Sequence, residues 1–495
     1  MKKIITITLA AALSFTSCDS FLDINQDPNS PSGSNVNADM IFPAVEMNIA
    51  NLYGNMLRIP SGYFAQHYGQ NFGTTNYLDF SRFEYSAQRV TNVYTRFYTL
   101  CLINLESVRE EAAASEEWGT YLAATVLRAF TFQVLVDAFG NVPYTESLDI
   151  NNATPVYDDG LTIYQGILAE LDDALSRVGS GDLVCTNFLY GNASSTNWIQ
   201  FANALKLRIL TRMSDVENVQ SQLAAVISEG NFPAGDIAFQ GIWANESGKA
   251  NPFYQEEFAT YFGSTQVNVI ANLAIVRTMQ QTDDNRLEAF FNTNGSNNYT
   301  GVVSGSNFPA GTEYNASYWC RPNATYDMPV NLITRSDIEF YLAEYYARYG
   351  SATEAEAHYK AAIDASFAAA GVTGAETIYD VAYPWNNGEY KRILGIQKWV
   401  ALSGTNNFEA WCELRRLKYP AFGTVSGEEL YNMQSDTYSP DLYVTGTLYT
   451  PIMVNTRLGN NKVLQRAQYA TSSMDRNQNA PEEQLNEGVP VFWAE

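Results

Sequence analysis

Apolar and small residues recur at helical spacing most clearly between residues 337 and 367, where the pattern predicts two helices separated by a break at 349–351. The positions that share one face are Leu342, Ala343 and Tyr346 on the first helix, and Ala355, Tyr359 and Ala362 on the second. Their order and spacing match the large, small and aromatic positions of a tetratricopeptide repeat. Glu339 and Phe367 stand where that repeat usually has Trp and Pro, so an ordinary helical hairpin is the alternative.

The same repeat pattern returns at Trp198, which is followed by Phe201, Ala202 and Leu205 at the expected spacing. This predicts a helix over 198–213 and a partner helix over 216–229. Further helices are predicted over residues 40–57, 92–114, 117–139, 161–178, 390–402 and 406–418, the first of them ending before Pro60. The predicted fold class is therefore all-α, with tetratricopeptide-like helix pairs decorated by long loops.

Three stretches lack a clear helical period and are rich in aromatic residues among Asn, Gly, Ser and Thr: residues 62–85, 232–262 and 292–330. The chain is also mostly loop from residue 431 onward. Long loops within a compact chain are usually functional or disordered. The 32 Tyr, 26 Phe and 8 Trp are numerous, and tyrosine combines an apolar ring with a polar tip that suits wet ligands. The alternative is that these rings fill the core beneath the loops.

Two of these stretches supply the mixture that a sugar needs, which is a flat ring for its C–H face and polar groups for its hydroxyls. The candidate ligand residues are Asn76, Tyr77, Asp79, Phe80, Tyr314, Tyr318, Trp319 and Arg321. We expect Tyr77 and Trp319 to form the stacking surface, with Asn76, Asp79 and Arg321 binding polar groups. A peptide would suit the same residues, its carboxylate meeting Arg321. The alternative for Trp319 is a core anchor that holds its loop.

The N-terminus has the pattern of an export signal, with two lysines before a short apolar run over residues 4–15 and a Thr-Ser-Cys sequence ending at Cys18. We expect residues 1–17 to be a lipoprotein signal peptide and Cys18 to carry the acyl (palmitate) anchor; a simple cleaved signal is the alternative. Residues 18–38 are polar, and we expect them to form a flexible tether. Their alternating Asp and Asn are similar to the start of a calcium-binding loop, but the Gly and Glu that such a loop requires are missing. Residues 39–495 are expected to form a single helical domain.

Charge and motif content narrow the possible functions. The net charge of −24 argues against nucleic-acid binding, which needs a basic surface. His67 and His358 have no partners at metal-ligand spacing, no nucleotide, serine-hydrolase or zinc motif occurs, and the four cysteines beyond Cys18 show no disulfide framework. We expect no metal and no cofactor. A glycosidase remains an alternative, because two carboxylates can be hidden among 53 acidic residues.

Four stretches, taken together, resemble the SusD/RagB family of surface lipoproteins. They are CDSFLDINQDPNSPS at 18–32, LVDAFGNVPYTESL at 135–148, the hairpin at 338–367 and KWVALSGTNNFEAWCELRRLKYP at 398–420. An Ala-Gln-His-Tyr segment at 65–68 is similar to one branch of the family. Each motif is weak alone, but their joint order after a lipoprotein signal is specific.

The resemblance implies an all-α fold in which about four tetratricopeptide-like helix pairs form one side and long loops carry the ligand contacts. It implies a lipid-anchored protein of the outer membrane, exposed at the cell surface. Such a protein captures a glycan or an oligopeptide and delivers it to a SusC-like TonB-dependent transporter, and it is not an enzyme. The family's ligand residues lie on variable loops and do not transfer by position. A surface glycoside hydrolase and a purely structural scaffold remain the other classes.

Overall fold

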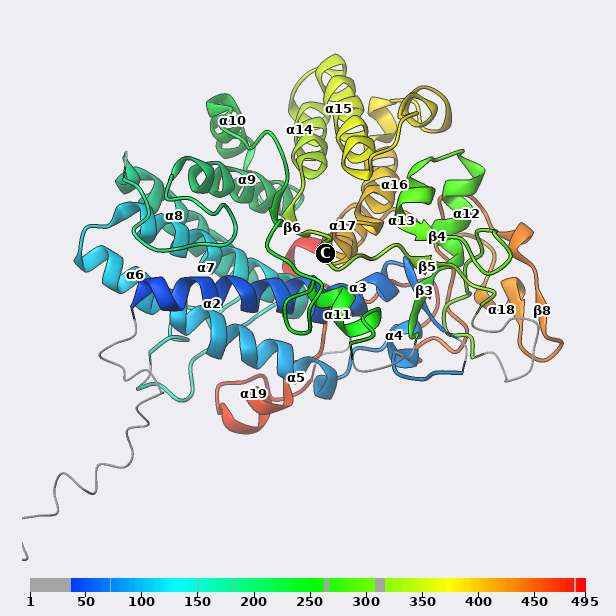
Figure 1. The fold of residues 1–495 in the computed structure, drawn as a ribbon, viewed down its shortest axis with the longest axis horizontal. Helices are drawn as coiled ribbons and strands as arrows, with labels where there is room; N and C mark the ends of the chain where they lie inside the picture. Colours follow the sequence, from blue (N-terminus) through cyan, green and yellow to red (C-terminus); the bar gives the residue numbers. More distant parts are fainter. Residues whose placement is uncertain are drawn as a thin grey trace, which may run out of the picture.

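The computed structural model describes residues 37–71, 73–149, 151–179, 181–261, 267–307, 317–484 and 487–495, which are mainly helical (Figure 1). The predicted signal peptide at 1–17, Cys18, nearly all of the tether and Tyr314 lie outside these described residues. The predictions made for them are therefore not tested by the structure.

The first helical segment is longer than the sequence predicts. It consists of α2 (Ala38–Asn51), the π-helical turn η1 (Leu52–Leu57) and α3 (Arg58–Phe64). The prediction that the helix ends before Pro60 is wrong. Pro60 is the third residue of α3, directly after the wider π turn η1, and the helix continues past it to Phe64.

Most of the other predicted helices are confirmed to within a few residues. They are α5 (Ala87–Arg96), η2 (Phe97–Leu102), α6 (Ile103–Ala114), α7 (Trp118–Phe139), α8 (Gly160–Val178), α9 (Thr196–Met213), α10 (Gln220–Glu229), α16 (Tyr390–Ser403) and α17 (Asn407–Leu417). Consecutive helices pack as pairs, α6 with α7, α9 with α10 and α16 with α17. The partner helix predicted over 216–229 begins later, at Gln220, because residues 214–219 form turns.

The hairpin at the centre of the repeat pattern consists of α14 (Arg335–Tyr349) and α15 (Ala352–Ala370). Thr334 and Asp337 form a capping box at the start of α14, and Ser351 caps α15. Ala343, Ala355, Tyr359 and Ala362 are all buried between the two helices and their neighbours. This confirms the packing predicted from their spacing. The all-α fold class with tetratricopeptide-like pairs is confirmed.

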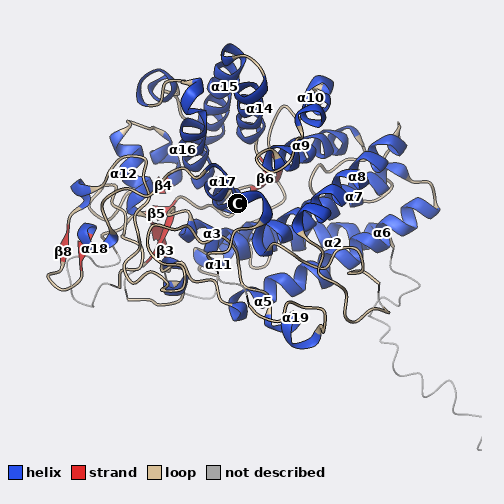
Figure 2. Cartoon of the chain, turned by 180° about the vertical axis from the view of Figure 1, so that it is seen from behind, coloured by secondary structure: helices blue, strands red, loops and turns tan. Residues whose placement is uncertain are grey.

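The strands are short, and those described form antiparallel pairs. The pairs are β1 (Tyr68–Gln70) with β3 (Val269–Ala271), β2 (Ile237–Phe239) with β6 (Val330–Ile333), β4 (Phe291–Asn292) with β5 (Arg321–Pro322), and β7 (Tyr431–Asn432) with β8 (Thr437–Tyr438). In Figure 2, β3, β4, β5 and β8 lie at the loop-rich end of the molecule, opposite α6, α7 and α8. In the β1–β3 pair, Tyr68 lies opposite Ala271.

Short helices interrupt the loops. They are α4 (Leu78–Ser81), α11 (Pro252–Glu257), α12 (Leu273–Gln281), α13 (Arg286–Phe290), η3 (Thr377–Ala382), η4 (Asn387–Glu389), α18 (Gly427–Leu430), η5 (Pro440–Leu442), α19 (Thr471–Arg476) and η6 (Phe492–Ala494). The prediction that residues 232–262 contain no helix is wrong at α11. Asn251 caps this helix and Pro252 begins it, but six residues are too few to show a helical period.

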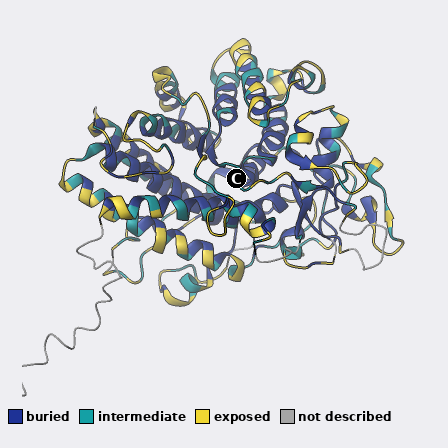
Figure 3. Cartoon of the chain, in the orientation of Figure 1, coloured by how far each residue is buried: buried dark blue, intermediate teal, exposed yellow. Residues whose placement is uncertain are grey.

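The core consists of three clusters, one among α2 to α9, one in the loop-rich end and one around the α14–α15 hairpin. Among the described residues, α7 is the one helix long and apolar enough to cross a membrane, but its apolar window is entirely buried within the protein (Figure 3). Its hydrophobicity is therefore explained by packing on all sides.

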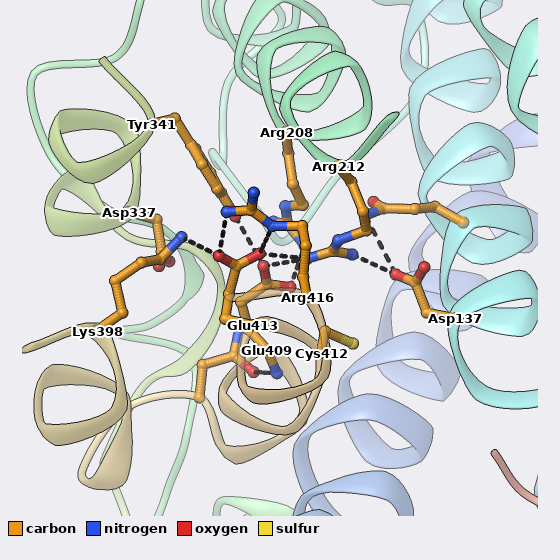
Figure 4. Close-up of polar contacts among 12 residues, drawn as sticks. Asp137, Arg208, Arg212, Asp337, Tyr341, Lys398, Glu409, Cys412, Glu413 and Arg416 are labelled. Carbon is orange, nitrogen blue, oxygen red and sulfur yellow. Dashed lines mark hydrogen bonds and ion pairs between the residues drawn. The ribbon is translucent and has the colours of Figure 1, made fainter. Parts of the chain in front are cut away.

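A buried ionic network joins the helix pairs at the middle of the molecule (Figure 4). Arg212 of α9 contacts Asp137 of α7 and Glu409 of α17, and the Tyr341 hydroxyl donates to Glu409 at 2.7 Å. Further contacts include Arg208–Glu409 at 3.4 Å, Arg212–Glu413 at 3.3 Å, Lys398–Glu413 and Arg416–Glu413 at 2.7 Å, and Arg416–Glu344 at 2.6 Å. Burial alone would raise the pKa of Glu409, but Arg212 and Arg208 hold that pKa below its usual range.

Candidate ligand-binding groove

A groove of about 330 Å³ lies where η1, α4, α5 and α11 meet. We call it the Tyr77 groove. Its lining consists of Asn51, Asn55, Met56, Ile59, Pro60, Tyr77, Phe80, Arg89, Arg96 and Glu256. Two of the eight residues predicted from the sequence, Tyr77 and Phe80, are among them. The volume is within the range of small-molecule sites.

Tyr77 and Phe80 form the aromatic wall of the groove. Their rings are nearly parallel, with centroids 5.5 Å apart and 10° between planes, and Tyr63 meets Tyr77 edge-on at 5.8 Å. The Tyr77 hydroxyl donates to Glu257 Oε1 at 2.6 Å, while its backbone N–H donates to Gln70 Oε1 at 2.7 Å. Burial raises the pKa of both Tyr77 and Glu257. Tyr77 is therefore a neutral ring held in one orientation.

Arg89 covers the other side of Phe80, with its guanidinium 5.0 Å from the ring centroid. Two predicted ligand residues hold it there. Asp79 accepts from Arg89 Nε at 2.7 Å and from Nη2 at 3.1 Å, and the Asn76 backbone carbonyl accepts from Nη2 at 2.5 Å. In this structure Asp79 thus positions Arg89, and Arg89 lines the groove.

The second predicted stretch divides between two places. Arg321 lies with its guanidinium 4.6 Å from the Phe258 ring and donates to the Glu257 carbonyl at 3.4 Å, so it meets Tyr77 through Glu257. Trp319 is 2% exposed and belongs to the loop-rich core, 5.5 Å from Tyr438 and 4.9 Å from Tyr318 between ring centroids. Its burial favours the alternative in which Trp319 anchors its loop.

The polar residues that line the groove are not among those predicted from the sequence. Asn55 is 9% exposed, and its Oδ1 accepts no hydrogen bond from any residue that the structure describes. Arg96 and Glu256 are exposed, and neither forms an ion pair within the described ranges. In the sequence, only the acidic pair Glu256-Glu257 indicates a polar site here. Its two members lie in different environments: Glu257 is buried against Tyr77, whereas Glu256 lines the groove.

The histidines, several carboxylates and the cysteines could in principle react or bind metal, but in this structure they are buried, cap helices or pair with other residues. His67 is buried, which lowers its pKa to about 3, and His358 lies on Tyr346 with Nδ1 2.6 Å from Glu339. The sequence also contains adjacent acidic residues such as Asp158-Asp159 and Asp283-Asp284. Of these, Asp159 caps α8 and Asp284 binds Arg286 at 2.6 Å. The four described cysteines are free and buried. Within the described residues, no cluster of His, Cys, Asp and Glu could hold a metal ion.

The comparisons with known proteins agree on one family. The SusD-like family described as "Starch-binding associating with outer membrane" matches residues 29–441. A SusD homolog from Bacteroides uniformis has 19% identity and a TM-score of 0.69, over 91% of this chain and 99% of that one. A chitin-binding SusD homolog from Flavobacterium johnsoniae has 18% identity and a TM-score of 0.68, over 91% and 98%. No curated protein sequence matches the chain.

Proposed function

Because this chain belongs to the SusD-like family, whose members are glycan-binding proteins associated with the outer membrane, we propose that it is a surface-exposed nutrient-binding lipoprotein. It captures a glycan in the Tyr77 groove and delivers it to a SusC-like TonB-dependent transporter. An oligopeptide is the alternative ligand. The chitin-binding relative of the same fold supports a glycan.

The observation that carries this proposal is the aromatic wall of the groove. Tyr77 is partly exposed, and hydrogen bonds at its hydroxyl and at its backbone N–H hold it in place. Asn51, Asn55 and Glu256 lie around it and offer donors and acceptors to hydroxyl groups. A fixed ring beside polar side chains is the arrangement that a sugar ring requires. Of the predicted residues, Tyr77 would touch the ligand, because Phe80 is buried between Tyr77 and Arg89. Phe80, Asp79, Asn76 and Arg321 would position the wall.

The test is a glycan-array screen of the purified protein, followed by calorimetric titration of the bound glycan. Tyr77→Ala should lower affinity by up to about tenfold, since loss of an aromatic contact costs about 0.5–1.5 kcal/mol. Tyr254→Ala, a half-buried tyrosine outside the groove lining, is the matched control. Unchanged affinity in Tyr77→Ala, or no bound glycan at all, would contradict the proposal.

Delivery and anchoring need separate tests. We expect an affinity-tagged chain to co-purify with a large barrel transporter from outer membranes. Cys18→Ala should release the protein into the periplasm or medium, because stable anchoring requires the acyl chains. Mature wild-type protein that retains residues 1–17 would rule out this anchor.

The alternative function, a surface glycoside hydrolase, predicts turnover. Incubating the bound glycan with protein and analysing the products by chromatography separates the two classes. Intact glycan after prolonged incubation supports a binding protein, and new reducing ends that depend on a carboxylate pair support the hydrolase.

A further inference from the structure

The charges around the Tyr77 groove differ from those of the chain as a whole. The protein carries a net charge of −24, yet two arginines of α5, Arg89 and Arg96, line the groove. They are seven residues apart, so they lie on one side of the helix about 10 Å from each other. Asp79 neutralises Arg89 at 2.7 Å. Arg96 has no carboxylate partner among the described residues.

A structural role does not explain Arg96. An arginine in the last turn of a helix can stabilise the free carbonyls there. At Arg96, however, the chain stays helical through η2 and α6 to Ala114, and the Phe97 N–H already donates to carbonyls of α5. The side chain is exposed and forms no hydrogen bond with a described residue. Its charge is therefore available to a ligand in the groove.

Asn55 is a second polar residue of the groove without a partner for its buried Oδ1. This residue lies on the π turn η1 and lines the groove, nine-tenths buried, with an Oδ1 that accepts no hydrogen bond from the described residues. Buried polar groups are normally paired, and an orphan needs an explanation. Single π turns occur often at functional sites because they displace a side chain from the regular helix face. The Oδ1 itself is closed to solvent, so a ligand hydroxyl would meet Asn55 at the part of its side chain that lines the groove.

Glu256 completes the set from the opposite element, α11. Glu256 is exposed and forms no ion pair with Arg96 or with another described residue. The groove therefore offers a ligand both the positive charge of Arg96 and the acceptor oxygens of Glu256. A neutral sugar would use Glu256, the asparagines and the ring of Tyr77 but would leave the charge of Arg96 unmatched. A sugar bearing an anionic group would use all of them.

Resting on the proposed function, we propose that the Tyr77 groove binds an acidic oligosaccharide. Arg96 binds the carboxylate or sulfate of one sugar unit, Asn55 and Glu256 bind its hydroxyls, and Tyr77 packs on its C–H face. The class therefore includes uronic acid oligomers and sulfated glycans, which share the anion.

The experiment compares ligands that differ only in charge. Oligogalacturonate is titrated against its methyl ester, and chondroitin sulfate fragments against their desulfated form, on an array that also holds neutral glycans. The acidic form should bind at least about tenfold more tightly than its neutral counterpart, since hydrogen bonds to charged groups are the stronger ones. Its affinity should fall as sodium chloride is raised. The carboxylated and sulfated arms distinguish the two sources of the anion.

Matched variants assign the residues. Arg96→Gln should remove the preference for the acidic form and most of its salt dependence, while Arg476→Gln, an exposed arginine of α19 outside the groove lining, should change neither. Asn55→Leu should weaken binding without lowering the thermal midpoint, because no described hydrogen bond of the folded protein is lost. A merely structural asparagine would lower the midpoint and spare affinity.

The outcomes that overturn the inference can be told apart. Binding of neutral glycans only, or equal binding of the acidic and neutral forms, overturns the acidic ligand while the proposed glycan-binding function stands. Binding of no glycan overturns both. Arg96→Gln with full preference for the acidic form overturns the role of Arg96.

Discussion

Tyr77 and Trp319 show how burial separates two aromatic residues that look alike in sequence. Both stand in loops rich in polar residues, and both were expected to stack on a ligand. Tyr77 lines the groove and keeps part of its ring exposed. Trp319 lies within the loop-rich core against Tyr438. Both rings have polar neighbours in the sequence, and the difference in their exposure arises from what packs over each ring.

For Trp319→Ala we expect a loss of about 3–5 kcal/mol in the free energy of unfolding, because a large buried ring leaves a cavity. Chemical denaturation of wild type and variant measures this, with glycan titration at low temperature alongside. Affinity should persist wherever the variant remains folded. A sharp loss of affinity with an unchanged thermal midpoint would instead assign Trp319 to the ligand.

The raised pKa of Glu46 on α2 predicts that the stability of the folded protein depends on pH. Its carboxylate accepts from the backbone N–H groups of Phe188 at 2.5 Å and Leu189 at 3.2 Å, so it ties a loop to α2. Burial raises the pKa of Glu46 from 4.5 to about 8, against the opposing effect of these hydrogen bonds. The folded protein therefore binds this proton more tightly than the unfolded chain does.

It follows that Glu46 lowers stability as pH rises from about 4.5 to about 8. In Glu46→Gln this loss should be absent, so the variant should gain on wild type across that window. The gain should exceed about 1.4 kcal/mol, the equivalent of one pKa unit. Urea denaturation of both proteins at pH 5, 6.5 and 8 tests it. A stability difference that is constant with pH would show that Glu46 does not titrate there.

At the scale of elements, the α14–α15 hairpin depends on small residues. Ala343 and Ala355 are fully buried where the helices pack. Ala343→Trp or Ala355→Trp should therefore overpack the pair and cost about 1–3 kcal/mol or more. Ala357→Trp, on the exposed face of α15, is the control and should have little effect. Equal thermal midpoints for all three variants would show that the two faces are not in contact.

At the scale of the whole molecule, the buried ionic network links helices that are distant in the chain. The single side chain of Arg212 contacts carboxylates on both α7 and α17 (Figure 4). Pairing of several charges offsets the cost of removing each from water. The network thereby fixes how the N-terminal helix pairs meet those that follow residue 334.

Replacing Arg212 by Met should cost about 3–5 kcal/mol, because Asp137 and Glu409 would remain buried with fewer partners. Arg177→Met, which breaks an exposed pair with Asp173 on α8, should cost less than about 1 kcal/mol. Denaturant midpoints of the two variants provide the comparison. Similar small losses in both would mean that the network contributes little to the stability of the assembled helix pairs.

The sequence by itself determined the positions of most helices, the pairing within the hairpin and the family. These features depend on residues three or four apart, on caps at helix ends and on motifs in a fixed order, all of which are local. It also placed Tyr77 and Phe80 among the ligand candidates, because an aromatic stretch with polar neighbours is visible without a fold.

Only the tertiary structure decided which residues meet. Asn55, Arg96 and Glu256 come from η1, α5 and α11, and nothing in their own neighbourhoods indicates that they share a groove. In the sequence Arg212 does not differ from other helical arginines, and only the packing of α7 and α17 against α9 shows that it is buried in an ionic network. The physical reason is that burial, an unpaired charge and an orphaned amide are properties of packing between distant segments, whereas helical periodicity is written within a single one.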